Sequence, residues 1–487
     1  MKPHRLALLS IVAASCGRAS PEGPGPFVYD DLSHSRKQNR VDYRLDPDTF
    51  AYQGAYAYAR LFDRLEIAGV TTLSLDETLD DTALEGFDAL FINLVSEDRP
   101  DFEPDEIAAV EKFVTSGGGL FVIADHSNAY GHAERLNRLL ARSGLEVMLH
   151  TAVETDESAT VEGLGWLLVS RFADHPVTRG LGAISLQTGG PIRGGTGLAF
   201  TTEHSFADLW DPNDPDGHYG DWEHGDQEPA GPLAVVASTE WGSGRVLIVG
   251  DQNIFGDGWL YFADNFALAA NAFDWVLGRA PGQLASSAPP GILVGLDQKH
   301  AGSSAGHTDP GGFHGLFLTL NRNARIDAHA RFELEPDDRL TILTDALAPF
   351  SEGEISTIRA SLSSGSSLFV LGETPAARAL LAALDPSYPG AGQAREPSQE
   401  PLRSDVVDVD GLEVPVSEAE LDWGERLIWT GRGDVARKRT VGGGDVIVFP
   451  RSVTFANSTL GDPTRPPEVP DAHTLVTRLV DWATRAK

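Results

Sequence analysis

Two hydrophobic patterns, one typical of helices and one typical of strands, meet in the stretch covering residues 103–125. Apolar residues in its first half share one helical face, namely Ile107, Val110, Phe113 and Val114. Residues 116–119 (Ser-Gly-Gly-Gly) then end the helix, because glycine readily adopts the left-handed conformation found at helix ends. Residues 120–124 are continuously apolar, as expected for a strand covered on both faces. The stretch therefore predicts a helix, a turn and a buried strand.

The same pattern returns at residues 351–373, which align with the first stretch without a gap. The identical pairs are Glu106/Glu354, Ile107/Ile355, Ser116/Ser364, Gly117/Gly365, Leu120/Leu368, Phe121/Phe369 and Val122/Val370. Residues 444–450 likewise match residues 244–250. We predict a tandem duplication, with a first domain over residues 27–279, a linker over residues 280–290 and a second, degenerate domain over residues 291–487.

Strand and helix patterns alternate along both halves of the chain. The predicted elements of the first half are strands at residues 27–31, 70–75, 88–94 and 145–149 and helices at residues 49–68, 133–144 and 264–277. Such alternation predicts an α/β fold with a mostly parallel sheet and helices on both faces. A Gly-Ser-Gly turn separates apolar runs at residues 233–238 and 245–250, so we predict that these two strands are antiparallel. From residue 161 to 226 the pattern predicts glycine-rich and acidic loops.

Residues 1–16 have the features of an export signal. Lys2 and Arg5 precede a short apolar run that cannot span a bilayer as a helix. Cys16 is the one cysteine of the chain, and its position after small residues resembles a bacterial lipoprotein processing site, although Ala13 stands where leucine is usual. The resemblance implies that Cys16 is lipidated; plain secretion is the alternative. We expect an exported protein, anchored to the bacterial cell envelope at the outer membrane or periplasmic face, with residues 17–26 as a tether.

The net charge of −33 argues against nucleic acid and anionic membrane surfaces as partners, because both repel an acidic protein. It fits a well-solvated surface, a divalent cation or a cationic partner. With no cysteine besides Cys16, the chain has no intrachain disulfide and no thiolate nucleophile in its folded part.

Five segments come one after another in a recognisable order: DALFINL, GGGLFVIAD, DHPVTRG, GSGRVLIVGD and DNFALAANAFDW. This order resembles the class I glutamine amidotransferase-like superfamily, and within it the group found in gliding-motility auxiliary and intraflagellar-transport proteins. The resemblance implies two tandem flavodoxin-like, doubly wound sheets. Amidotransferases of this class carry a cysteine after the central strand, where this chain has Asp125, His126, Ser127 and Asn128. Without a thiol the thioester route is absent, so we expect a non-catalytic binding or scaffolding module.

Polar residues come directly after the predicted strands of the first domain, at the edge where open parallel sheets bind ligands. The predicted ligand-binding residues are Asp31, His34, Asn93, Asp125, His126, Asp251 and Asn253. Carboxylate, imidazole and amide groups suit a divalent metal or a polyol. Asp31, His34 and Asp125 are the candidate metal ligands; we predict no other cofactor.

The second domain provides an internal comparison. It retains Asp31-x-x-His34 as Asp297-x-x-His300, but Thr374 replaces His126 and Arg451 replaces Asp251. We therefore expect the ligand site in the first domain and a structural or interaction role for the second. The alternative for the Asp-x-x-His pair is loop capping, with the aspartate accepting backbone hydrogen bonds.

Four further hypotheses remain open. A metal-dependent hydrolase of carbohydrate or ester substrates would use the Asp and His residues of the first domain. A serine hydrolase centred on Ser127 lacks the Gly-x-Ser-x-Gly spacing, and we expect Asp125 and His126 to point apart. The acidic loop at residues 203–228 contains Asp214, Asp216 and Glu223, which suit weak calcium binding. It also contains Trp210, Tyr219 and Trp222, which suit stacking on a sugar. The fourth hypothesis is a purely structural role beside an envelope protein of a transport or motility complex.

Overall fold

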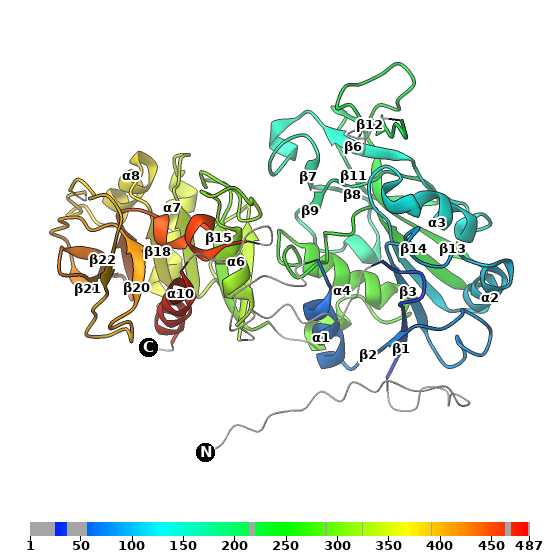
Figure 1. Ribbon diagram of the computed structural model, residues 1–487, viewed down its shortest axis with the longest axis horizontal. Helices are drawn as coiled ribbons and strands as arrows, with labels where there is room; N and C mark the ends of the chain where they lie inside the picture. The colour runs from blue at the N-terminus through cyan, green and yellow to red at the C-terminus, as the bar shows by residue number, and fades with distance from the viewer. Residues whose placement is uncertain are drawn as a thin grey trace.

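The computed structural model describes residues 25–36, 56–213, 220–287, 290–323, 325–390, 392–462 and 469–485. Two α/β domains lie side by side, the first coloured blue to green and the second yellow-green to red (Figure 1). The predicted signal peptide with Cys16 and most of the predicted tether lie outside the described residues. Within the described ranges, no helix has the length and apolar character needed to cross a membrane.

The first domain is built on an eight-stranded sheet with the order β2-β1-β3-β4-β14-β13-β11-β8. The strands are β1 (Phe27–Asp31), β2 (Thr71–Leu75), β3 (Ala89–Asn93), β4 (Gly119–Ile123), β8 (Arg171–Phe172), β11 (Thr196–Phe200), β13 (Ala234–Trp241) and β14 (Gly244–Val249). Neighbours from β2 to β14 pair in parallel, in the 2-1-3-4-5 order of flavodoxin-like folds. The predicted antiparallel pairing of the last two runs is confirmed as β13 with β14.

Helices cover both faces of this sheet, because successive strand residues point to opposite sides. They are α1 (Ala59–Ile67), α2 (Pro104–Thr115), α3 (His132–Leu140) and α4 (Asn265–Val276). Phe91 and Phe121 point to the face that α1 and α4 cover, where Phe273 packs on both rings. Leu90 and Leu120 point to the face that α2 and α3 cover. The predicted doubly wound α/β fold is confirmed.

The second domain repeats this topology in a seven-stranded sheet with the order β16-β15-β17-β18-β23-β22-β21. Its strands are β15 (Ile292–Asp297), β16 (Ile326–Arg331), β17 (Leu340–Thr344), β18 (Ser367–Leu371), β21 (Glu425–Trp429), β22 (Asp434–Val441) and β23 (Gly444–Phe449). Its helices are α6 (His314–Asn321), α7 (Glu352–Ser363), α8 (Pro375–Leu384), α9 (Asn457–Leu460) and α10 (Pro470–Ala483). The seven strands follow the same order as the first seven strands of the other sheet, and β8 has no counterpart. The duplication itself stays a prediction.

The domains differ in the segments that come after their central strands. The first carries three small antiparallel pairs, formed by β5 (Leu145–Val147) with β10 (Ile192–Gly194), β6 (His150–Glu154) with β12 (Ser205–Leu209), and β7 (Trp166–Val169) with β9 (Ile184–Gln187). The second carries only β19 (Ser398–Pro401) with β20 (Glu413–Val416) among its described residues. The prediction of loops from residue 161 to 226 was therefore wrong for much of this segment, because its strands are too short to show a clear period.

Short helical segments complete the described chain: η1 (Ala129–Gly131), η2 (Glu157–Ala159), η3 (Pro176–Thr178), α5 (Gln283–Ser287) and η4 (Val453–Phe455). The α5 helix lies inside the predicted linker, and Leu284 is buried against the core. The helix predicted at residues 49–68 is observed only as α1, since residues 37–55 lie outside the described part.

The two domains share one hydrophobic core. Phe262, which lies between β14 and α4, packs on Trp166 of the first domain and on Phe317 of the second, with ring centroids 5.6 and 5.0 Å apart. Its neighbours extend the edge of the second sheet: the backbone N–H of Ala330 in β16 donates to the carbonyl oxygen of Tyr261 at 3.0 Å. Arg60 Nη2 in α1 lies 2.8 Å from Asp327 Oδ1 in β16, with both side chains largely buried.

We predict that Arg60→Met destabilises the whole protein, because it leaves the Asp327 carboxylate buried without its nearest charge partner. The free energy of unfolding should fall by about 2 to 3 kcal/mol, measured by urea denaturation. The matched control is Lys112→Met, which breaks an exposed pair with Asp81 and should cost less than about 1 kcal/mol. Equal effects of the two substitutions would contradict the coupling of the domains through Arg60.

Candidate functional site

Asp31 and His34 form a structural connection between the end of β1 and the start of α2. The His34 Nδ1 atom lies 3.2 Å from both carboxylate oxygens of Asp31, and its Nε2 atom lies 3.5 Å from Glu106 Oε2. Glu106 is the carboxylate of the α2 capping box, whose Oε2 accepts from the backbone N–H of Glu103 at 2.9 Å. The His34 ring stacks on Phe102 with a centroid distance of 4.2 Å. The polar groups of the connection are thus engaged within the protein.

The second domain contains the same connection. His300 Nδ1 lies 2.9 Å from Asp297 Oδ2, and His300 Nε2 lies 3.5 Å from Glu354 Oε2. Glu354 closes the capping box of α7, and the His300 ring stacks on Phe350 at 3.9 Å. A retained Asp–His–Glu arrangement at two helix starts favours the capping alternative over a metal site for the Asp-x-x-His pair.

The charge environment of His34 agrees with a structural role. Burial alone lowers the pKa of His34, but the hydrogen bond and charge of Asp31, joined by the charge of Glu106, outweigh burial and raise the pKa overall. The imidazolium form is therefore stabilised in the folded protein, which suits an ion pair and opposes metal ligation by a neutral ring.

Asp125, His126 and Ser127 lie on the turn after β4 and contact one another. His126 Nδ1 is 2.9 Å from Ser127 Oγ, and His126 Nε2 is 3.9 Å from Asp125 Oδ1. The expectation that Asp125 and His126 point apart was therefore wrong, because their side chains lie within ion-pair distance of each other. Ser127, the next residue of the turn, has a left-handed φ of 50°. Ser127 has no exposed surface, however, so a substrate carbonyl cannot reach its hydroxyl in this conformation.

Asp251 and Asn253 come directly after β14 and lie at the same edge, because β14 is parallel to β4. The Asp251 carboxylate accepts from the backbone N–H groups of Gln187 and Asn253, each at 2.7 Å. Burial raises the pKa of Asp251 to about 7, although these backbone donors oppose the shift. The fully buried Tyr58 hydroxyl donates to the carbonyl oxygen of Gln252 at 2.6 Å, and burial together with the charges of Asp251 and Asp125 raises its pKa.

A segment of the first domain closes this edge. The backbone N–H of Gly190, between β9 and β10, donates to the carbonyl oxygen of Gly250 at 2.6 Å. A side chain at Gly190 would begin 2.2 Å from the carbonyl oxygen of Asp125, and one at Gly250 would begin 2.1 Å from that of Gly190. Glycine at both positions therefore lets two backbone segments touch, and the polar edge of the first domain is sealed by its own chain.

The seven predicted site residues therefore have different outcomes. Asp31, His34, Asn93, Asp125, His126 and Asp251 are all buried, and Asn253 is partly buried. The backbone N–H of Asn93 donates to Ser35 Oγ at 2.9 Å. Among the described residues, no group of three or more His, Cys, Asp or Glu side chains could hold a metal ion. Asp31 and His34 engage Glu106, so a role with Asp125 as metal ligands stays a prediction without geometric support.

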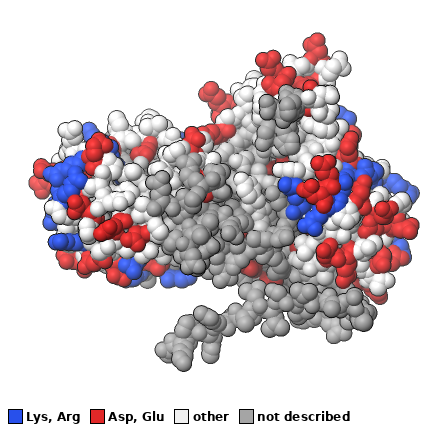
Figure 2. Space-filling view, viewed as in Figure 1, with Lys and Arg blue, Asp and Glu red and all other residues white. Residues whose placement is uncertain are grey.

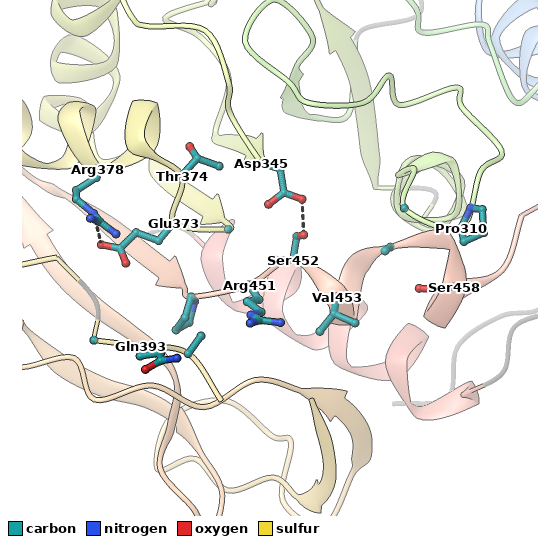
Figure 3. Close-up of a pocket in the computed structure, with 16 residues that line it drawn as sticks. Pro310, Asp345, Glu373, Thr374, Arg378, Gln393, Arg451, Ser452, Val453 and Ser458 are labelled. Carbon is teal, nitrogen blue, oxygen red and sulfur yellow. Dashed lines mark hydrogen bonds and ion pairs between the residues drawn. The ribbon is translucent and has the colours of Figure 1, made fainter. Parts of the chain in front are cut away.

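The equivalent edge of the second domain is open. A cavity of about 670 Å³ lies beyond the carboxyl ends of β17, β18 and β23 (Figure 3). It is lined by Pro310, Gly311, Asp345, Gly372, Glu373, Thr374, Arg378, Gly392, Gln393, Ala394, Pro450, Arg451, Ser452, Val453, Ala456 and Ser458. Ligands of open α/β sheets bind at this place. The cavity therefore lies in the domain that the sequence comparison took to be degenerate.

Charged and hydroxyl groups meet inside this cavity. Ser452 Oγ donates to Asp345 Oδ2 at 2.5 Å, and burial raises the pKa of Asp345 against this hydrogen bond. Glu373 Oε1 accepts from the Tyr388 hydroxyl at 2.6 Å and lies 3.4 Å from Arg378 Nε. Thr374 caps α8 by accepting from the backbone N–H of Ala377 at 3.1 Å. Figure 3 shows the Glu373–Arg378 pair on one side of the Asp345–Ser452 pair, with Pro310 and Ser458 on the other.

Arg451 is the charged lining residue with the weakest internal partner. Its Nη2 atom lies 3.6 Å from Glu396 Oε1, and the side chains are 43% and 87% exposed. An ion pair this exposed contributes little, so the guanidinium is available to an anionic group. The sequence did not predict the cavity, because Arg451 and Thr374 were considered only as residues that replace the predicted ligand-binding residues Asp251 and His126. The feature of the sequence that could have indicated the cavity is the positively charged Arg451, which follows a predicted strand of the second domain.

We predict that His34→Asn destabilises the protein by about 1 to 3 kcal/mol at acidic pH. The raised pKa of His34 means that its contribution is fully present below its ordinary pKa of 6.5 and is lost as pH rises through the folded-state pKa. Urea denaturation of parent and variant between about pH 5.5 and pH 8.5 measures this difference.

His175→Asn provides a control of opposite sign, because burial and then the Arg245 charge lower the pKa of His175. Its contribution is present above pH 6.5 and lost as pH falls. A difference for His34→Asn that stays constant or grows with rising pH would contradict the ion-pair account.

Part of the first domain matches a family model. Residues 52–273, within the first domain, match the model of a domain of unknown function, DUF4350. No curated protein matches the chain.

Solved structures also align with about half of the chain. The mmIFT52 N-terminal domain is 16% identical with a TM-score of 0.38, covering 51% of this chain and 97% of that one. A putative ThuA-like protein from Bacteroides uniformis is 14% identical with a TM-score of 0.28, covering 53% and 95%. The exo-beta-1,4-mannosidase Op5Man5 from Opitutaceae bacterium strain TAV5 is 12% identical with a TM-score of 0.25, covering 44% and 38%. Sequence identities and TM-scores this low support no conclusion about function. The observed strand order is that of the doubly wound fold which the sequence resemblance implies.

Proposed function

We propose that this protein is an exported, lipid-anchored binding protein of the cell envelope, and that the cavity of the second domain is its ligand site. The observation that supports this best is a cavity of about 670 Å³ at the strand ends, lined by Asp345, Glu373, Arg378 and Arg451. Its volume falls in the range of small-molecule sites in proteins. Export and anchoring rest on the sequence around Cys16, which lies outside the described residues.

The lining favours a small solute that carries both an anionic group and several hydroxyl groups. Arg451, with its exposed and weak partner, provides a cation for a carboxylate or phosphate. Asp345 and Glu373 provide acceptors for hydroxyl donors, and Ser452 adds a hydroxyl oxygen that can accept a hydrogen bond. A sugar acid satisfies both halves of this set. A purely apolar ligand would displace water from these carboxylates without replacing the hydrogen bonds that the water makes.

The lining does not favour catalysis by the amidotransferase route. Thr374 stands at the turn after β18, where those enzymes carry the cysteine, and its hydroxyl caps α8. In the first domain, the Ser127 hydroxyl is buried beneath the closed edge. We therefore keep the metal-dependent hydrolase of carbohydrate or ester substrates only as the alternative, since no cluster of ligands in the described ranges supports it.

The wider surface is rich in charged side chains of both signs. Figure 2 shows acidic side chains spread over both domains on the face in view, with basic side chains interspersed. Such a surface keeps a protein of net charge −33 well solvated. A scaffolding role toward another envelope protein is compatible with ligand binding, because the cavity occupies one edge of one domain.

We predict that at least one member of a panel of gluconate, glucuronate, glucose 6-phosphate and glutamate raises the melting temperature of the protein. Binding to the folded state alone stabilises it by about 2.7 kcal/mol at a hundredfold excess over Kd. Differential scanning fluorimetry measures the shift. Arg451→Gln should remove it, because the ligand anion loses its guanidinium partner.

The matched control is Arg142→Gln, an exposed arginine of the first domain with 76% side-chain exposure that should leave the shift unchanged. Two results would contradict the proposal: no member of the panel stabilises the parent protein, or Arg451→Gln and the parent respond alike.

A further inference from the structure

A second recess lies on the first domain and has a different chemistry. Its volume is about 360 Å³, and it is lined by Glu162, Gly163, Leu164, Gly165, Trp166, Gln187, Thr188 and Trp222. Unlike the cavity of the second domain, it contains two indole rings and no cationic side chain among these residues. Leu164 is 42% exposed and Trp222 is 36% exposed, so large apolar groups face solvent here. We call these residues the tryptophan groove.

The chain holds Trp222 at this place by specific contacts. Asp208 in β12 accepts hydrogen bonds from the backbone N–H groups of Asp221, at 3.2 Å, and Trp222, at 2.7 Å. Trp222 adopts a left-handed φ of 63°, which is unusual for a bulky residue and is stabilised by these two bonds. At Gly165 a side chain would begin 2.8 Å from the Trp222 ring, so the absence of one lets the indole lie against the β7 segment. The ring is thus positioned and still one-third exposed.

Trp166 and Glu162, which also line the groove, are held in place by contacts where the two domains meet. Trp166 donates from Nε1 to Ser185 Oγ at 2.7 Å and packs on Phe262, which also contacts the second domain. Glu162 Oε1 lies 3.2 Å from His307 Nε2 of the second domain. The groove therefore combines a rigid aromatic wall with a carboxylate, an amide from Gln187 and a hydroxyl from Thr188.

We propose that the tryptophan groove binds a neutral saccharide, with a pyranose ring stacked on Trp222. A pyranose presents an apolar C–H face and a rim of hydroxyl groups, which matches an exposed indole bordered by carboxylate, amide and hydroxyl groups. Anionic ligands are disfavoured, because Glu162 and the net charge of −33 repel them and no cation lines the groove. Purely apolar ligands would cover the Glu162 carboxylate without offering it a hydrogen bond.

This inference is independent of the sugar acid site proposed for the second domain. The two recesses share no lining residue, and their charges differ: Arg378 and Arg451 line the cavity, whereas Glu162 is the one charged residue lining the groove. One protein can therefore bind a neutral polysaccharide and a small anionic solute at separate places.

The test is isothermal titration of the full chain with four trisaccharides: cellotriose, mannotriose, galactotriose and chitotriose. We expect at least one to bind with a Kd of about 0.1 to 1 mM, which corresponds to about −4 to −5.5 kcal/mol. Trp222→Ala should weaken binding at least about tenfold, whereas Trp222→Phe keeps a stacking surface and should stay within about threefold of the parent. Circular dichroism shows whether each variant is folded.

Two controls locate the site. Trp210→Ala removes a tryptophan that comes directly after β12 and does not line the groove, and it should leave trisaccharide binding unchanged. Arg451→Gln, which tests the second-domain cavity, should also leave it unchanged. The inference is overturned if none of the four trisaccharides binds, if Trp222→Ala binds as the parent does, or if Arg451→Gln abolishes binding.

Discussion

The constraint on which this structure depends is the shared carboxyl edge of its parallel strands. Parallel strands end together, and the backbone and side-chain polar groups at their ends need partners once the sheet is covered on both faces. In the first domain the chain supplies these partners itself, through Gly190 on Gly250 and the backbone donors of Gln187 and Asn253 on Asp251. In the second domain the same edge remains a cavity.

The Asp–His–Glu connection provides partners for polar groups in the loop that comes after the first strand of each sheet. It joins the loop after the first strand to the capping box of α2 in the first domain and of α7 in the second, with equal distances from histidine to glutamate. A histidine held between two carboxylates is fixed in place, so the loop that precedes the ligand edge is rigid. Its presence in both domains is therefore explained by folding, and the two domains differ instead at their strand ends.

Most of the fold could be predicted from the sequence because the parallel strands are short, continuous apolar runs between amphipathic helices. The pairing of β13 with β14 could be inferred from a glycine turn of the kind that hairpins require. The strand at β5 was predicted, but its antiparallel pairing with β10 and the pairing of β6 with β12 were not, since a periodic pattern does not show which distant segment a strand pairs with.

The candidate site was predicted less well, for a physical reason. Sequence shows which polar residues come after the strands, but it does not show which segment folds over them. Asp31, Asp125 and Asp251 do lie at or beyond the strand ends, but they are buried. In the sequence comparison, Arg451 replaces the predicted ligand-binding residue Asp251. In the structure, Arg451 lines an open cavity together with Ser452. Whether an edge is a site depends on the covering chain, which is set by long-range packing.

The measurement that tests this account most directly is the accessibility of one equivalent position in each domain. In the full chain carrying Cys16→Ser, no cysteine remains, so Gln252→Cys and Ser452→Cys each introduce a single thiol. We predict that the thiol at position 452 reacts with a small maleimide within about tenfold of the rate of free cysteine, and that the thiol at position 252 reacts at least about a hundredfold more slowly. Equal rates, or faster reaction at position 252, would contradict a closed edge in the first domain and an open ligand cavity in the second.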